Sequence, residues 1–157
     1  SPRRSSRLAW VASVRAGRSA GASPTVSSMR CAAPRRQTFS DSDCPGRAAA
    51  TSMLESGGGT IIFSGATGSI RGGAGFAAFA SPKFALRGLA QAMARELGPK
   101  SIHVAHVILD GMIAQEDDSS ETLLQPAAIA QSYYQLHRQA RSAWTHELDL
   151  RPSSEKF

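Results

Sequence analysis

Cysteine and long apolar runs are both scarce in this sequence of 157 residues. The two cysteines, Cys31 and Cys44, are thirteen residues apart with no histidine nearby, so they do not make a metal site. Nothing in the sequence demands a disulfide between them, and we interpret them as two incidental free thiols. No stretch approaches the ~18 consecutive apolar residues of a membrane span, so no membrane partner is expected.

Acidic residues are scarce in the N-terminal arm, residues 1–45. This arm holds eight arginines and two aspartates, whereas the rest of the chain holds ten basic and ten acidic residues. The net charge of +6 therefore belongs to the arm. The arm is rich in Arg, Ser, Ala and Pro, and only Leu8–Ala12 is apolar for more than a few residues. Such a composition cannot build a core, which predicts a disordered segment.

Three interpretations of the arm compete. An arginine-rich, serine-rich and acid-poor segment is typical of a mitochondrial transit peptide. Its arginines are also suited to nucleic-acid phosphates, but no aromatic platform accompanies them. GC-rich DNA translated out of frame gives the same composition, and the chain opens on Ser1 rather than Met, as a fragment or processed product does. We favour an arm without function, no nucleic-acid partner and a cytoplasmic location, with mitochondrial targeting as the alternative.

The remaining residues, 46–157, carry the pattern of an α/β domain with a parallel sheet. The apolar run Thr60–Phe63 lies between three glycines and Ser64-Gly65, which indicates a short buried strand. A second apolar run, Ile102–Leu109, is joined to it by a helical pattern, which predicts a parallel pair. Residues 144–150 alternate in polarity, which predicts a half-buried strand at a sheet edge.

Three helices are expected around these strands. The first covers residues 47–55. The second begins near Ala77, contains Pro82 and ends at Gly98-Pro99, which cannot continue a helix. The third begins at Pro126, a residue well suited to the first helical turn. The second helix has an apolar face at helical spacing, formed by Leu86, Leu89, Ala90, Met93 and Leu97.

Several segments, in this order, resemble the catalytic half of a short-chain dehydrogenase/reductase. They are residues 60–68 (TIIFSGATG), 79–86 (FASPKFAL) and 90–98 (AQAMARELG), followed by the tail 134–152. The spacing of Phe79 and Lys83 is similar to that family's Tyr-x-x-x-Lys. The resemblance covers residues 46–157 and implies the C-terminal half of a Rossmann-like, doubly wound parallel sheet with about three strands and flanking helices.

The resemblance also implies a chemistry. Members of the family bind NAD or NADP and act on a small carbonyl or alcohol substrate. Their tyrosine is the acid/base, their lysine lowers the tyrosine pKa and holds the nicotinamide ribose, and a serine orients the substrate oxygen. Lys83 stands at the lysine position and Phe79 at the tyrosine position. The serine position falls nearest Gly65, with Ser64 just before it and Ser69 further on.

Three residues at the end of the second predicted strand are candidate neighbours of the nicotinamide. They are Asp110, Gly111 and Ile113, and the alternative for Asp110-Gly111 is an ordinary turn. For Lys83 the alternative is a solvated helix lysine, and for Ser64 it is a loop serine bonded to its own backbone.

Two departures from the family pattern limit the expected function. Phe79 has no proton to transfer, and the phosphate-binding Gly-x-x-x-Gly-x-Gly loop is absent. We therefore expect an NAD(P)-dependent oxidoreductase that is incomplete and weakly active or inactive as this chain. The alternative is a non-catalytic Rossmann remnant that binds or oligomerises, with a second copy of the chain as partner.

Overall fold

The computed structural model describes residues 7–11, 45–115 and 120–155. Its sheet has four parallel strands in the order β1-β2-β3-β4. The strands are β1 (Arg7–Val11), β2 (Gly59–Ser64), β3 (Ile102–Leu109) and β4 (Glu147–Leu150). The helices are α1 (Pro45–Ser56), α2 (Ala77–Leu97) and α3 (Pro126–Arg138), with 3₁₀ turns η1 (Thr67–Ser69), η2 (Gly98–Lys100) and η3 (Arg141–Ala143).

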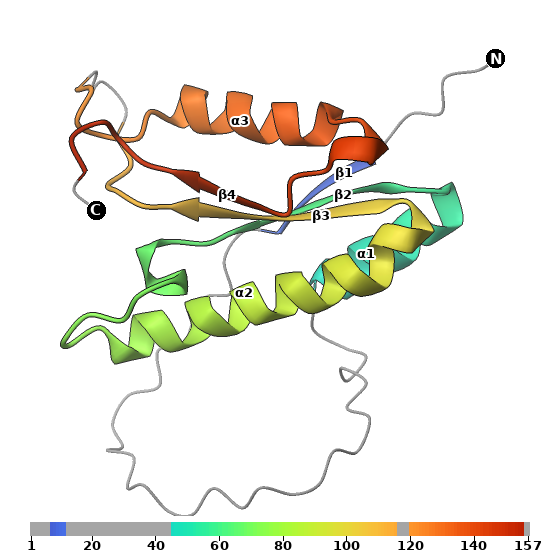
Figure 1. Ribbon diagram of the computed structural model, residues 1–157, viewed down its shortest axis with the longest axis horizontal. Helices are drawn as coiled ribbons and strands as arrows, with labels where there is room; N and C mark the ends of the chain where they lie inside the picture. Colours follow the sequence, from blue (N-terminus) through green and yellow to red (C-terminus); the bar gives the residue numbers. More distant parts are fainter. Residues whose placement is uncertain (1–6, 12–44, 116–119, 156–157) are drawn as a thin grey trace, which may run out of the picture.

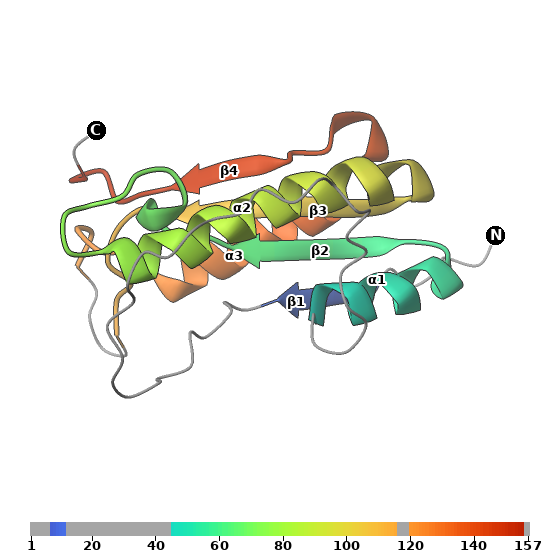
Figure 2. The same cartoon turned by 90° about the horizontal axis from the view of Figure 1, so that it is seen from below.

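The sheet is covered on both faces. Helices α1 and α2 pack on one face and α3 on the other (Figure 1), and Figure 2 shows the strands running side by side in the same direction. Alternate residues of a strand point to opposite faces, so Ile61 and Phe63 join the α1/α2 core, whereas Ile62 joins the α3 core. Each such fully buried side chain contributes about 1.5–3 kcal/mol to the free energy of unfolding. No helix in the described part of the chain is long and apolar enough to cross a membrane.

The predicted sheet is confirmed for β2, β3 and β4, which lie side by side in one parallel layer. The strand expected over residues 144–150 begins only at Glu147, since residues 144–146 connect η3 to β4. The expectation for the arm differs in two places, because Arg7–Val11 pairs in parallel with β2 and Pro45 begins α1. The rest of the arm, including Cys31 and Cys44, lies outside the described residues.

Helix α2 begins at Ala77, as predicted, and extends over 21 residues with Pro82 inside it. Pro82 lacks an N–H to donate to the preceding turn. The neighbouring Ser81 hydroxyl donates to the carbonyl of Ala77 at 2.8 Å. The buried face of the helix carries Ala80, Leu86, Ala90 and Leu97. The first turns of α2 lie beside the carboxyl end of β2, because Lys83 reaches the carbonyl of Ser64 there. Parallel α/β sheets place their ligand sites at this end of their strands.

Candidate active site

Lys83 lies at the carboxyl end of β2. Its Nζ donates a hydrogen bond to the backbone carbonyl of Ser64 at 3.2 Å and is 5.9 Å from the centroid of the Phe79 ring. The two side chains come from the same helix face because they are four residues apart. Partial burial lowers the pKa of the Lys83 ammonium. The structure therefore brings Lys83, Phe79 and the end of β2 together, as the Phe-x-x-x-Lys spacing predicts.

Phe79 covers the backbone of the loop that follows β2. A Cβ atom at Gly68 would lie 2.9 Å from ring atom Cε1 of Phe79, so a larger residue there would have to displace the ring. The ring remains 48% exposed. A phenyl group has no proton to give or take, so this position supplies an apolar surface and no acid/base chemistry.

Ser64 turns its hydroxyl away from Lys83. Its Oγ is 2.8 Å from the hydroxyl of Tyr133 on α3, which covers the opposite face of the sheet. Phe63, the preceding residue of the strand, points toward α1 and α2, so the alternation of the strand sends Ser64 the other way. Burial raises the pKa of Tyr133, and the hydrogen bond to Ser64 offsets part of that rise. Ser64 thus contributes its carbonyl, and not its hydroxyl, to the Lys83 side.

His106 fills the space that a side chain at Gly65 would need. A Cβ at Gly65 would lie 2.3 Å from Nε2 of His106, whose side chain is fully buried. Nδ1 of this histidine is 3.1 Å from Oε2 of Glu147. Arg87 donates two hydrogen bonds to the same carboxylate, at 2.8 and 2.7 Å. Ser69, the third candidate for the serine position, is also buried, and its Oγ accepts from the amide of Ala66 at 3.1 Å.

His106, Glu147 and Arg87 form a cluster, and the pKa shifts within it follow from its contacts. Hydrogen bonding to Arg87 lowers the pKa of Glu147, and burial lowers the pKa of His106. Sequence reasoning missed the cluster, although two signals were available. His106 lies at even spacing from Ile102 and Val104, which face α2, and Glu147 alternates with Leu148 in the edge strand.

Asp110 is held inside the protein. Its carboxylate is 1% exposed, accepts a hydrogen bond from the Thr67 hydroxyl, and lies 3.3 Å from Arg71 and 3.1 Å from Arg151. At the next residue, Gly111 (φ 157°), a Cβ would lie 2.7 Å from Cδ of Pro152. Both residues therefore serve a tight junction with the C-terminal segment, and their role as nicotinamide neighbours stays a prediction.

Ile113 is the third predicted neighbour of the nicotinamide. Its side chain is 47% exposed, beside the 74% exposed Met112, and its backbone forms a bridge with Leu124. An exposed apolar side chain after the end of β3 is compatible with contact to a flat ring, and this role also stays a prediction. Within the described ranges, no group of three His, Cys, Asp or Glu is placed to hold a metal ion.

The sheet is parallel and helices cover both of its faces, so the fold is Rossmann-like α/β. The sequence profile of the family described as short chain dehydrogenase matches residues 45–122. A search among curated proteins gives no match.

Several solved structures are also similar to this chain. A short-chain dehydrogenase from Rhodopseudomonas palustris is 54% identical, with a TM-score of 0.58, over 68% of this chain and 44% of that protein. A metagenomic short-chain oxidoreductase in complex with NADP is 27% identical (TM-score 0.55; 69% and 45% of the two chains). A 4-hydroxyisoleucine dehydrogenase complexed with NADH and succinate is also 27% identical (TM-score 0.56; 68% and 50%).

The chain belongs to the short-chain dehydrogenase/reductase family. It spans about half the length, or less, of the solved relatives it matches.

Proposed function

We propose that this chain carries the nicotinamide-facing and substrate-facing half of an NAD(P)-dependent oxidoreductase, and that it has weak or no turnover by itself. The observation that carries the proposal is the position of Lys83, one helical turn after Phe79 and 3.2 Å from the carbonyl at the end of β2. An ammonium offers several donors, which suits the hydroxyls of a nicotinamide ribose. The exposed side chains of Phe79 and Ile113 add apolar surface at the same end of the sheet.

The residues fit only the nicotinamide end of the cofactor. NAD(P)H, when bound, supplies a hydride to the carbonyl carbon of a small substrate. Lys83 would hold the ribose, whereas the proton for the carbonyl oxygen has no donor at Phe79, and the phosphate-binding glycine motif is absent from the sequence. The relatives of equal identity carry NADP in one case and NADH in the other, so they do not favour either cofactor.

Isothermal titration with NADH and NADPH tests the binding. We expect a dissociation constant below about 1 mM for at least one of them. Lys83→Met keeps the apolar stem and removes the ammonium, so it should weaken binding by about tenfold, equivalent to one charge-assisted hydrogen bond. Lys100→Met is the matched control, because Lys100 is exposed and its ion-pair partner among the described residues is Glu96, four residues before it. No heat with either cofactor, or equal affinity in the two variants, would contradict the proposal.

Phe79→Tyr tests the missing proton donor. Phe79 is half exposed, which favours tolerance of an added hydroxyl. We expect the variant to gain measurable NADPH- or NADH-dependent reduction of a simple carbonyl compound, whereas Phe79→Leu, the control, should gain none. The absence of a gain in a variant that binds the cofactor would weaken the assignment of position 79.

A second candidate function is a non-catalytic module that associates with a second copy of itself. The exposed aromatic residues Phe76, Phe79 and Phe84 favour it, because they lie at or near the start of α2 and two of them remain nearly half exposed. Sedimentation equilibrium over a range of concentrations tests this candidate, and self-association without cofactor binding supports it.

The cytoplasm remains the proposed location, with mitochondria as the alternative, and fractionation of cells that express the tagged chain distinguishes them.

A further inference from the structure

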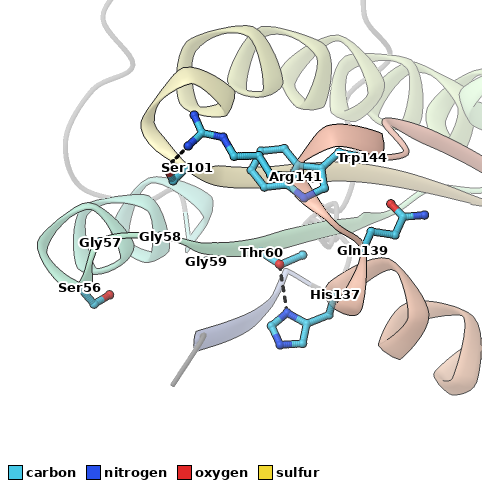
Figure 3. A pocket seen from close by; sticks show the side chains of 10 residues that line it. All are labelled: Ser56, Gly57, Gly58, Gly59, Thr60, Ser101, His137, Gln139, Arg141 and Trp144. Carbon is cyan, nitrogen blue, oxygen red and sulfur yellow. Dashed lines mark hydrogen bonds between the residues drawn. The ribbon is translucent and has the colours of Figure 1, made fainter. Parts of the chain in front are cut away.

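A hollow lies at the end of the sheet opposite to Lys83. Figure 3 shows it between the glycine segment 57–59 after α1, the start of β2 at Thr60, and the segment after α3 that carries Arg141 and Trp144. Its volume is about 250 Å³. That is slightly below the ~300–1,000 Å³ of drug-sized ligand sites, so it suits a compact molecule.

Two chain segments that line this hollow, at Gly58 and at Ser101, lie close together. Gly57 and Gly58 have positive φ angles of 84° and 142°, and a Cβ at Gly58 would lie 2.8 Å from the carbonyl oxygen of Ser101. Glycine is therefore required here for conformation and for space. One wall consequently has no side chains, and a small ligand can approach its backbone closely.

The charge of the hollow is positive. None of its ten lining residues is Asp or Glu, and Arg141 is among them. Arg141 donates to Oγ of Ser101 at 2.8 Å and to the carbonyl of Pro99 at 3.1 Å, both neutral acceptors. Within the described part of the chain it forms no ion pair with a carboxylate. A guanidinium has five N–H donors, so these two bonds neither neutralise its charge nor use all its donors.

Two further polar groups line the same space. The hydroxyl of Ser101 accepts from Arg141 and retains its own proton for donation. Nδ1 of His137 is 3.0 Å from the Thr60 hydroxyl, which leaves Nε2 as the second polar atom of that ring. The indole of Trp144 is held in place, because it stacks on His103 at 4.9 Å between centroids and lies 6.0 Å below the guanidinium carbon of Arg141.

We propose that this hollow is a binding site for a small oxyanion-bearing molecule, held through its phosphate or carboxylate group by Arg141 and Ser101. Arg141 supplies an uncompensated positive charge in a fork that matches either group. The site is separate from Lys83, since β2 starts at the hollow with Gly59 and ends at Ser64, about 16 Å away at ~3.3 Å per residue. It does not depend on the proposed dehydrogenase function.

The test titrates the full chain with inorganic phosphate and, separately, with acetate, followed by amide chemical shifts. We expect saturable shifts at Gly57, Gly58, Thr60 and Ser101. Response to phosphate alone assigns a phosphate ligand, response to acetate alone assigns a carboxylate, and response to both assigns a general oxyanion site. No saturable shift with either ion overturns the proposal, and this result needs no variant.

Matched variants identify the group responsible. Arg141→Gln should weaken binding by at least about tenfold, the loss expected for a charge-assisted hydrogen bond. Arg138→Gln makes the same change in charge three residues away, on a side chain that does not line the hollow, and should leave affinity within about twofold. Equal weakening by both would show a general charge effect and overturn the proposal. Lys83→Met should leave this binding unchanged, which separates it from cofactor binding.

Discussion

At the scale of the residue, the contact between Gly65 and His106 gives the first prediction. Gly65→Ala would place a methyl carbon 2.3 Å from Nε2 of a fully buried imidazole and 2.8 Å from Oγ of Ser69. We expect the free energy of unfolding, measured in urea, to fall by about 1–3 kcal/mol, as in other overpacked cores. Gly65→Ser introduces the same Cβ and the same clash with His106, so it should not provide a working substitute for the serine of the family.

A control and a double variant make this prediction specific. Gly88→Ala adds a methyl group on α2 where, apart from the helix itself, no atom of the described residues lies within 4 Å, so stability should rise by up to about 1 kcal/mol. His106→Ala should relieve the clash, and the double variant should therefore cost less than the sum of the two single variants. Strict additivity would contradict the proposed contact.

The sequence predicted some of these residues better than others. Lys83 and Phe79 follow from a local spacing within one helix, and the structure brings them together. The surroundings of Ser64, Gly65 and Asp110 depend on partners distant in the chain. Tyr133 is 69 residues from Ser64, and Thr67 is 43 residues from Asp110. Such contacts are set by the packing of the sheet, and no local pattern encodes them.

At the scale of the element, the periodicity of apolar residues predicted the helices and strands that pack against the core. The apolar face of α2 and the continuous apolar run of β3 were found with bounds that match the structure. The start of β4 was placed three residues early, because the alternation of polarity extends back to Trp144, whereas the ladder with β3 begins only at the hydrogen bond from the His106 N–H to the carbonyl of His146. β1 was not predicted, since pairing with the open edge of β2 is a tertiary choice for a short and isolated apolar run.

Asp110 joins three elements, and its substitution provides the second prediction. The carboxylate connects the loop at η1 with the end of β3 and the segment after β4, through Thr67, Arg71 and Arg151. Asp110→Asn keeps the size and removes the charge, so Arg151, which is 15% exposed, loses a buried counter-charge. We expect the free energy of unfolding to fall by about 3 kcal/mol, at the lower end for buried ion pairs because Arg71 is half exposed.

Asp149→Asn is the control for that prediction. Asp149 also pairs with Arg151, but it is 37% exposed, so its loss should cost no more than about 1 kcal/mol. Urea unfolding of both variants under the same conditions measures the difference. Similar losses in the two variants would show that burial of Asp110 does not matter.

At the scale of the whole molecule, two buried histidines on opposite faces of the sheet make stability depend on pH. His106 faces α2 and His103 faces the α3 side, where its Nε2 lies 2.8 Å from the carbonyl of Thr145. Burial is the main cause that lowers the pKa of each below its ordinary value of 6.5. In the folded protein both rings therefore stay neutral at pH values where the unfolded chain has taken up protons.

The sign of the effect follows from that difference. Below pH 6.5 the unfolded chain binds more protons than the folded protein, so the free energy of unfolding falls as the pH is lowered, by at most about 1.4 kcal/mol per pH unit for each histidine. Glu147 acts in the same direction at lower pH, because Arg87 lowers its pKa from 4.5 and its stabilising contribution is lost as it becomes protonated.

Urea unfolding at about pH 7.5, 6 and 5 should give decreasing stabilities. His103→Gln should make the decline between the first two values shallower by about half, since one of two titrating rings is removed. Stability that is constant or rises on acidification from neutral pH would show that neither imidazole is held neutral by burial.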